Sequence, residues 1–185
     1  DSNYSKGYTK VSIENHVYLV ELLKEARLYV FRDITQQENL SNYNQNQSPV
    51  IGYLSIDNYS DVQIAVGDET KFNDMLSDLR KMIVEFGETS HSLMRRIKDS
   101  RYLFITTMES YEKMFKDKFS IVDSVRSRFP GEFTLSLGVS YGFPDYAKLA
   151  ELASNALDVA LSRGGDQTVI QPFGKQMIYI GGKTE

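Results

Sequence analysis

The first part of the chain alternates apolar and polar residues with the two-residue period of β-strands. Segments 7–13, 16–22 and 26–34 are rich in Val, Tyr, Ile and Leu, and short polar turns separate them. This pattern predicts three antiparallel strands joined by hairpin turns. Three strands bury too little apolar surface to form a core, so we expect this meander to need a further surface to pack against.

A polar segment follows these strands. Residues 36–48, QQENLSNYNQNQS, are almost all polar, and Pro49 closes the run. The start of the segment could extend a helix, whereas its Asn, Gln and Ser tail has the composition of a linker. We therefore predict strands over 1–35, a polar linker over 36–48 and a second domain over 49–185.

Strands and helices alternate in the predicted second domain. The pattern predicts strands over 50–57, 92–97, 101–107, 133–142, 167–171 and 176–180. Apolar residues at helical spacing predict helices over 72–86, 110–128 and 145–162, the last capped by Gly164. Strand, helix, hairpin, helix, strand is the order of a split βαβ unit, which predicts an α+β fold with a ferredoxin-like palm. In that layout Asp57, at the end of a strand, should lie beside the hairpin turn Lys98–Ser100.

Composition narrows the classes of function. Of 185 residues, 41% are hydrophobic and 25% charged, which is typical of globular domains. The net charge of −4 and the lack of a basic cluster longer than Arg95-Arg96 argue against nucleic-acid binding. The chain has no cysteine, which excludes disulfides and thiolate metal sites. No apolar run approaches the roughly 20 residues that span a bilayer, so we expect no direct membrane contact. Because the chain begins with Asp, we interpret it as a piece of a longer protein.

Several motifs carry a resemblance to a known family. LSIDNY (54–59), LSLGVSYG (135–142) and the helix LAELASNALDVALSRGGDQTVI (149–170) resemble the GGDEF domain of diguanylate cyclases, over about residues 50–171. ALDVALSRGGDQTVI (156–170) and IYIGGKTE (178–185) are similar to the variant GGDEF domain of GdpP (YybT)-type proteins, which are membrane-bound bacterial cyclic-di-AMP phosphodiesterases. LYVFRDIT (28–35) resembles the end of a PAS domain. The resemblance implies an α/β sandwich of nucleotidyl-cyclase type, preceded by a PAS-like remnant.

The resemblance also implies where catalytic metals would bind. Active cyclases of this fold hold two Mg²⁺ ions with carboxylates, one at the end of the first strand and one in the GGDEF turn. Ser55 stands at the first of these positions and Ser100 at the second, while Arg101 replaces the transition-state Glu. Lys98 and Asp99 fill the positions of the two glycines. Hydroxyls are poor substitutes for carboxylates on Mg²⁺, so we predict no metal site, with Asp57 as the only candidate ligand.

Other family positions are also changed. The phosphate-binding Lys and Arg align with Leu161 and Gly165, and the guanine-contacting Asn aligns with Gln63. The window of the product-inhibition motif RxxD reads Glu88-Thr89-Ser90-His91. Two-metal phosphoryl transfer needs these groups together, so we do not expect cyclase activity and assign no catalytic residue.

The remaining polar residues each allow two interpretations. Asp57 could accept backbone hydrogen bonds from the loop that follows it, or help to hold a cation or nucleotide. The Lys98–Arg101 turn could be a solvated hairpin, or its cations could bind phosphate directly. The candidate nucleotide-binding residues are therefore Asp57, Asn58, Tyr59, Ser60, Lys98, Asp99 and Arg101, with Tyr59 as a base-stacking surface. His16 and His91 have no neighbour at ligand spacing and are not assigned to a metal or haem.

These observations lead to one main hypothesis and two alternatives. The main hypothesis is a regulatory module, a homodimer in the cytoplasmic part of a membrane-anchored phosphodiesterase. It would relay a signal from a PAS domain to a DHH/DHHA1 catalytic domain, which binds Mn²⁺ and which this chain lacks. The first alternative is a weak ATP-binding or ATPase domain that uses ATP with Mg²⁺. The second is an active diguanylate cyclase, which the changed metal positions disfavour.

Overall fold

The computed structural model describes residues 8–182 of the chain. The last part of the IYIGGKTE motif, 183–185, lies outside the described residues, as does residue 7 of the first predicted strand. The chain divides into two compact units, Asp1–Asn46 and Gln47–Glu185. No helix among the described residues is long and apolar enough to cross a membrane.

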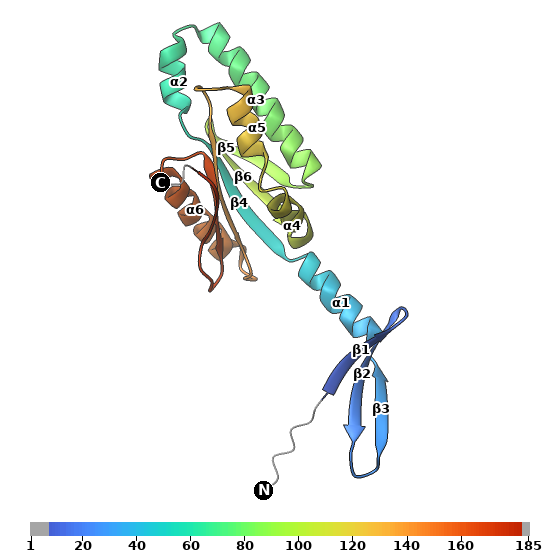
Figure 1. The fold of residues 1–185 in the computed structure, drawn as a ribbon. Helices are drawn as coiled ribbons and strands as arrows, with labels where there is room; N and C mark the ends of the chain where they lie inside the picture. Colours follow the sequence, from blue (N-terminus) through green and yellow to red (C-terminus); the bar gives the residue numbers. More distant parts are fainter. Residues whose placement is uncertain (1–7, 183–185) are drawn as a thin grey trace. The chain divides into compact units, whose positions relative to one another are not determined.

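The first unit is the predicted antiparallel meander followed by a helix (Figure 1). Its strands are β1 (Tyr8–Ile13), β2 (His16–Leu23) and β3 (Leu28–Asp33), in the order β1-β2-β3. Helix α1 (Thr35–Asn46) occupies most of the segment that the sequence predicted as a linker. That prediction was wrong for the tail of the segment. Gln is a good helix former, Asn and Ser lower helix propensity without ending a helix, and the first proline comes only at 49.

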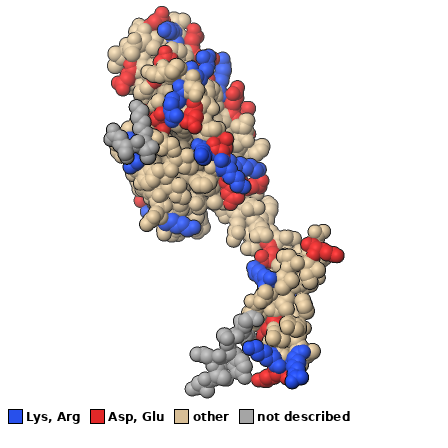
Figure 2. All heavy atoms as spheres, viewed as in Figure 1, with Lys and Arg blue, Asp and Glu red and all other residues tan. Residues whose placement is uncertain are grey.

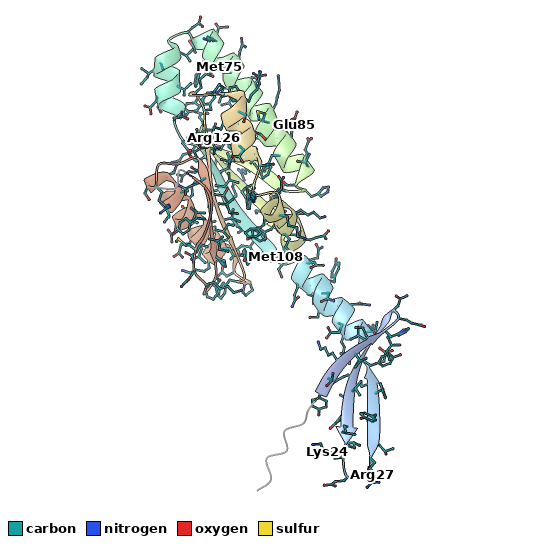
Figure 3. The ribbon with its side chains drawn as sticks, in the orientation of Figure 1. Lys24, Arg27, Met75, Glu85, Met108 and Arg126 are labelled. Atoms are coloured by element: carbon teal, nitrogen blue, oxygen red, sulfur yellow. The ribbon has the colours of Figure 1, made fainter. Side chains whose placement is uncertain are left out.

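Almost every described side chain of the first unit is exposed or half-buried. Ile34 is the only one that is buried. Lys24 and Arg27 lie at the turn between β2 and β3 (Figure 3), while apolar residues such as Tyr29 and Phe31 remain exposed along β3. The structure therefore bears out the expectation that these three strands enclose no core of their own.

The second unit is one six-stranded sheet with helices on both sides. Its elements are β4 (Pro49–Ile56), α2 (Tyr59–Val66), α3 (Glu69–Thr89), β5 (Leu93–Lys98), β6 (Arg101–Thr107), α4 (Met108–Lys116), α5 (Ile121–Arg128), β7 (Leu135–Tyr141), α6 (Tyr146–Ser162), β8 (Gln167–Pro172) and β9 (Ile178–Gly181). The strand order is β5-β6-β4-β7-β8-β9, and only β7 and β8 run parallel. Figure 1 shows α6 on one side of the sheet and α3, α4 and α5 on the other. The α+β fold is therefore confirmed.

The structure corrects the predicted helices in two places. Helix α2 was not predicted, because only Val62 of its eight residues is buried and its apolar periodicity is weak. The helix predicted over 110–128 is two helices, because Lys118 and Phe119 between them have positive φ values of 55° and 53°. Phe119 is nevertheless buried, so the apolar pattern continues across the break.

The last helix is capped by Gly164, as predicted. Gly164 has a φ of 99° and follows the C-cap residue Arg163. The N–H groups of Gly164 and Gly165 donate to the carbonyl oxygens of Leu161 and Ala160, which is the pattern of a glycine-capped helix end.

The core lies mainly between the sheet and helices α3, α4 and α5. Phe104, Phe133 and Leu137 are among its fully buried side chains. On the other side α6 packs directly on β7, where a Cβ atom at Gly138 would lie only 2.2 Å from the backbone nitrogen of Leu157. Only glycine permits this separation between the α6 backbone and the sheet.

Gly138→Ala tests this close approach. We expect it to lower the free energy of unfolding by about 1–3 kcal/mol or more, because the added methyl group must push α6 from the sheet. Urea unfolding followed by circular dichroism would measure the loss. Asn155→Ala, on the exposed side of α6, is the control and should change stability by less than about 0.5 kcal/mol. Equal stability of both variants and the unmodified chain would contradict this packing.

Candidate functional site

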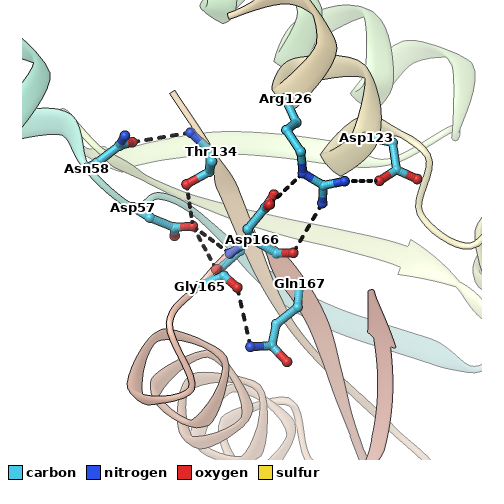
Figure 4. A network of polar contacts seen from close by, with 9 residues as sticks. Asp57, Asn58, Asp123, Arg126, Thr134, Gly165, Asp166 and Gln167 are labelled. Carbon is cyan, nitrogen blue, oxygen red and sulfur yellow. Dashed lines mark hydrogen bonds and ion pairs between the residues drawn. The ribbon is translucent and has the colours of Figure 1, made fainter. Parts of the chain in front are cut away.

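Asp57 follows the last residue of β4 and binds groups from two distant segments. Its Oδ2 atom accepts hydrogen bonds from the hydroxyls of Thr134 and Ser136, at 3.1 and 2.9 Å, and from the backbone N–H of Asp166 at 2.9 Å. Figure 4 shows these groups converging on the carboxylate. Asp57 is thus an internal acceptor, although its backbone donor comes from the loop after α6 rather than from the loop that follows Asp57.

The loop after α6 has a backbone that suits this contact. Gly164, Gly165 and Asp166 have φ values of 99°, 72° and 57°, so three consecutive residues adopt left-handed conformations. A Cβ atom at Gly165 would lie 2.7 Å from Oδ2 of Asp57. Glycine at 165 therefore satisfies two constraints, the positive φ and the space that the carboxylate occupies.

Asn58 binds the segment that leads into β7. Its amide nitrogen donates to the backbone oxygen of Glu132, and its Oδ1 accepts from the backbone N–H of Thr134 at 3.2 Å. Asp57 and Asn58 together fix the end of β4 to residues 132–136. Oδ2 of Asp57 and both polar atoms of the Asn58 amide are therefore occupied by internal hydrogen bonds.

A second carboxylate extends the network towards α5. Asp166 accepts from Nε of Arg126 at 2.5 Å, and the same guanidinium donates to Asp123 at 2.8 Å. The hydrogen bond to Asp166 raises the pKa of Arg126, so this side chain stays charged. Sequence reasoning missed Arg126 and Asp166. The available signal was a charged residue directly after two glycines; Gly164 was interpreted as a helix cap, and Gly165 was aligned with the family's phosphate-binding Arg.

The electrostatics of Asp57 reflect its partial burial. Burial raises the pKa of Asp57 above its usual value, and the nearby Asp166 carboxylate adds to the increase. The hydrogen bonds from Asp166, Ser136 and Thr134 oppose it but do not cancel it. Oδ1 of Asp57 is buried and has no protein partner. A carboxyl in this position is easier to protonate than one in water.

The hairpin turn lies where the sequence predicted it, next to the end of β4. The backbone N–H of Ile56 donates to the carbonyl oxygen of Ser100 at 2.8 Å. Asp99 is exposed and stands 3.9 Å from both Arg80 and Arg96. Lys98 and Arg101 face each other across the turn and form no ion pair with any described residue. The backbone of the turn is therefore hydrogen-bonded to β4, while Lys98 is exposed and Arg101 is half-buried.

The other predicted residues are divided between packing and solvent. Ser55 is buried within the sheet, opposite Arg101 on β6 and Ser136 on β7. The ring of Tyr59 makes an edge contact with Phe72, with centroids 5.3 Å apart, and Ser60 is exposed in the first turn of α2. The binding of a nucleotide by these residues stays a prediction.

The structure describes no cluster that would hold a metal ion. Among residues 8–182, no three His, Cys, Asp or Glu side chains come together in a suitable arrangement. His16 lies in the first unit and stacks near Tyr18, whereas His91 lies between α3 and β5 in the second. Over the face seen in Figure 2, acidic and basic side chains of the second unit are interspersed.

A cavity of about 470 Å³ lies between α3, α4 and α5. It contains part of the window predicted for the product-inhibition motif, namely Thr89, Ser90 and His91. The hydroxyls of Thr89 and Ser90 donate to backbone oxygens at the end of α3, including that of Phe86. These hydroxyls complete the helix end, and Lys113, which also lines the cavity, forms an ion pair with Glu109.

Comparisons with known proteins agree with this architecture. Residues 54–178 match the family model described as the GGDEF domain of GdpP-like cyclic-di-AMP phosphodiesterases. The chain is 32% identical over 178 residues to the cyclic-di-AMP phosphodiesterase GdpP of Bacillus subtilis, covering 94% of this chain and 27% of that protein. It is 32% identical over 187 residues to the cyclic-di-AMP phosphodiesterase PdeA of Listeria monocytogenes, covering 98% of this chain and 28% of that protein. The chain thus spans about a quarter of the length of these relatives.

Solved structures show the same fold at low identity. The GGDEF domain of DgcB from Caulobacter crescentus, in complex with c-di-GMP, aligns with a TM-score of 0.56 at 16% identity, covering 73% of this chain and 83% of that one. The active GGEEF domain of a diguanylate cyclase from Vibrio cholerae aligns with a TM-score of 0.51 at 18% identity, covering 77% of this chain and 90% of that one.

The raised pKa of Asp57 predicts a specific pH dependence of stability. A raised folded-state pKa means that the folded chain binds the proton more tightly, so the stability from Asp57 is complete below its unfolded value near 3.8 and is lost as pH rises through the folded pKa. Unfolding free energies of the unmodified chain and Asp57→Asn, measured in urea between about pH 4 and 7, test this. We expect the unmodified chain to lose stability relative to the variant as pH rises. A constant difference, or one of opposite slope, would contradict the assignment.

Proposed function

The chain belongs to the GGDEF domain family of GdpP-like cyclic-di-AMP phosphodiesterases, and from this membership we propose that it is a regulatory module without cyclase activity. Relatives that this chain matches are several times longer than it is. The proposed module would relay a signal from a PAS domain, whose end is the first unit, to a DHH/DHHA1 catalytic domain. The parent protein would be anchored in the cell membrane.

The residues at the family's two metal-ligand positions, Ser55 and Ser100, are the main support for this proposal. Ser55 is buried in the sheet, and the carbonyl oxygen of Ser100 accepts the N–H of Ile56. Neither residue has a carboxylate, and the one carboxylate at the end of β4, that of Asp57, accepts three internal hydrogen bonds. Mg²⁺ bound to a triphosphate needs hard anionic oxygens. The site supports a rigid connection between strands better than it supports catalysis.

A second candidate function is weak binding of ATP with Mg²⁺. Lys98 and Arg101 support it, because they carry positive charge beside the end of β4 and pair with no described carboxylate. Such cations could contact phosphate oxygens directly, in place of a metal held by carboxylates. This arrangement favours binding more than hydrolysis, since it supplies no group to activate water.

Nucleotide assays distinguish the two candidates. We expect no cyclic-di-GMP from GTP and Mg²⁺, as followed by chromatography. If the ATP candidate is correct, Lys98→Ala/Arg101→Ala weakens ATP binding in calorimetry at least tenfold, because two charged hydrogen bonds of about 1.5–3 kcal/mol each are lost. Lys148→Ala, on α6, is the control. No ATP binding at millimolar concentration would eliminate the second candidate, and cyclic-di-GMP formation would overturn the first.

The first unit supports the further proposal that the chain is a homodimer. Its strands expose apolar side chains that a monomer leaves in water, including Phe31 at 55% exposure. Both β1 and β3 are edges of their sheet, and unpaired edges favour association between chains. A second copy would cover this surface.

Sedimentation analysis tests the homodimer. We expect Phe31→Glu to raise the dimer dissociation constant at least tenfold, because it places a charge in a surface that association would bury. Val84→Glu is the control, since Val84 is equally apolar and 52% exposed but lies on α3 of the second unit. A dimer unaffected by Phe31→Glu, or a monomeric unmodified chain at micromolar concentration, would contradict the proposal.

A further inference from the structure

The large sheet has two edge strands that differ in character. Strands β5 and β9 end the order β5-β6-β4-β7-β8-β9. β9 has only four residues, and the guanidinium of Arg163 covers its Tyr179, 4.8 Å from the ring centroid. β5 has six residues, and its outer side pairs with no other described strand. It therefore presents the longer free row of backbone donors and acceptors.

Apolar side chains accompany this free edge. Leu93 is 72% exposed and Ile97 is 45% exposed. In register, Leu93 and Arg95 lie opposite Ile105 and Leu103 of β6, which are themselves only partly buried. Helix α6, on that side of the sheet, packs mainly on β4, β7 and β8. The outer part of this face is thus apolar and incompletely covered.

The same edge concentrates positive charge in a chain whose net charge is −4. Arg95, Lys98 and Arg101 form no ion pair with any described residue, and Arg96 shares Asp99 with Arg80 at 3.9 Å. Four cations and one carboxylate therefore lie within nine consecutive residues, 93–101. This part of the sheet attracts anionic groups, in contrast to the chain as a whole.

Charges and bulges on edge strands often serve to prevent aggregation, and β5 has both, with a register shift between Arg96 and Lys98. Protection alone does not account for an exposed Leu93 beside these charges. Antiparallel pairing of β5 with a second copy about Arg95 would place that guanidinium directly opposite Arg95 of the other chain, since opposite residues share one face. Like charges directly opposite each other destabilise a strand pair. A segment with carboxylates at these positions avoids the repulsion and complements the cations of this edge.

We propose that β5 accepts an extended segment of a partner protein in which pairs of carboxylates alternate with pairs of aliphatic side chains, so that each face of the added strand carries both kinds. The segment adds a seventh strand to the sheet through backbone hydrogen bonds along β5. Its carboxylates pair with Arg95 and Arg96, and its aliphatic side chains cover Leu93. This interaction is separate from the relay and the nucleotide candidate, since it uses the outer side of β5 rather than the end of β4.

A synthetic strand tests the inference directly. The probe is a fluorescein-labelled peptide, acetyl-(Glu-Glu-Val-Val) repeated twice, added to the whole chain and followed by fluorescence anisotropy. We expect Arg95→Glu and Leu93→Asp each to weaken binding about tenfold or more, since each places a repelling or solvated charge at the contact. Lys175→Glu, which makes the same change of charge in the β8–β9 turn, should alter binding less than about twofold.

Two further measurements separate strand addition from simple charge attraction. Hydrogen exchange should show slower exchange for amides of residues 93–98 when the peptide is bound. A peptide with proline in place of each valine keeps the charge but cannot pair as a strand, so it should bind at least about tenfold more weakly. Equal binding of the proline peptide, no binding at about 1 mM peptide, or binding only to phosphatidylglycerol vesicles would overturn the proposal. Circular dichroism of each variant confirms that a loss of binding is not a loss of fold.

Discussion

One carboxylate connects the parts of the second unit that are farthest apart in sequence. Oδ2 of Asp57 joins the end of β4 to β7, through Thr134 and Ser136, and to the loop after α6, through the backbone of Asp166. Those partners lie 77 to 109 residues away along the chain. Hydrogen bonds to a charged acceptor are stronger than neutral ones, and this acceptor is partly withdrawn from water. The arrangement of β4, β7 and α6 at this end of the sheet depends on it.

That role limits what Asp57 can do for a ligand. A carboxylate that holds a metal must present its oxygens outward, whereas here one oxygen receives three donors and the other is buried without a partner. The left-handed loop 164–166 closes against it, and Gly165 leaves no space between them. A ligand at Oδ2 of Asp57 would have to displace these hydrogen bonds. At the hairpin turn Lys98 is exposed and Arg101 half-buried, and neither pairs with a described carboxylate, so they are the groups on which a nucleotide candidate depends.

The sequence predicted those features that repeat along the chain and missed those that do not. Strand alternation and helical periodicity located all nine strands of the described residues and the long helices. The break at Lys118 and Phe119 was missed because a buried Phe119 preserves the apolar spacing through a change of backbone direction. The partners of Asp57 could not be predicted, because Thr134, Ser136 and Asp166 come together only when the sheet and α6 pack. The hairpin turn was placed correctly because strand order alone brings it beside β4.

Serine at positions 55 and 100 suits the pairing of β4 with the hairpin. Acidic side chains at these positions would lie close together, since Ile56 binds Ser100 and β4 pairs with β6 there. Without a cation their repulsion would destabilise the strand pair. Two serines avoid that repulsion, so the pairing of β4 with the hairpin continues to its end. The relay that we propose would benefit from this, because the geometry of its strands would not require a bound metal.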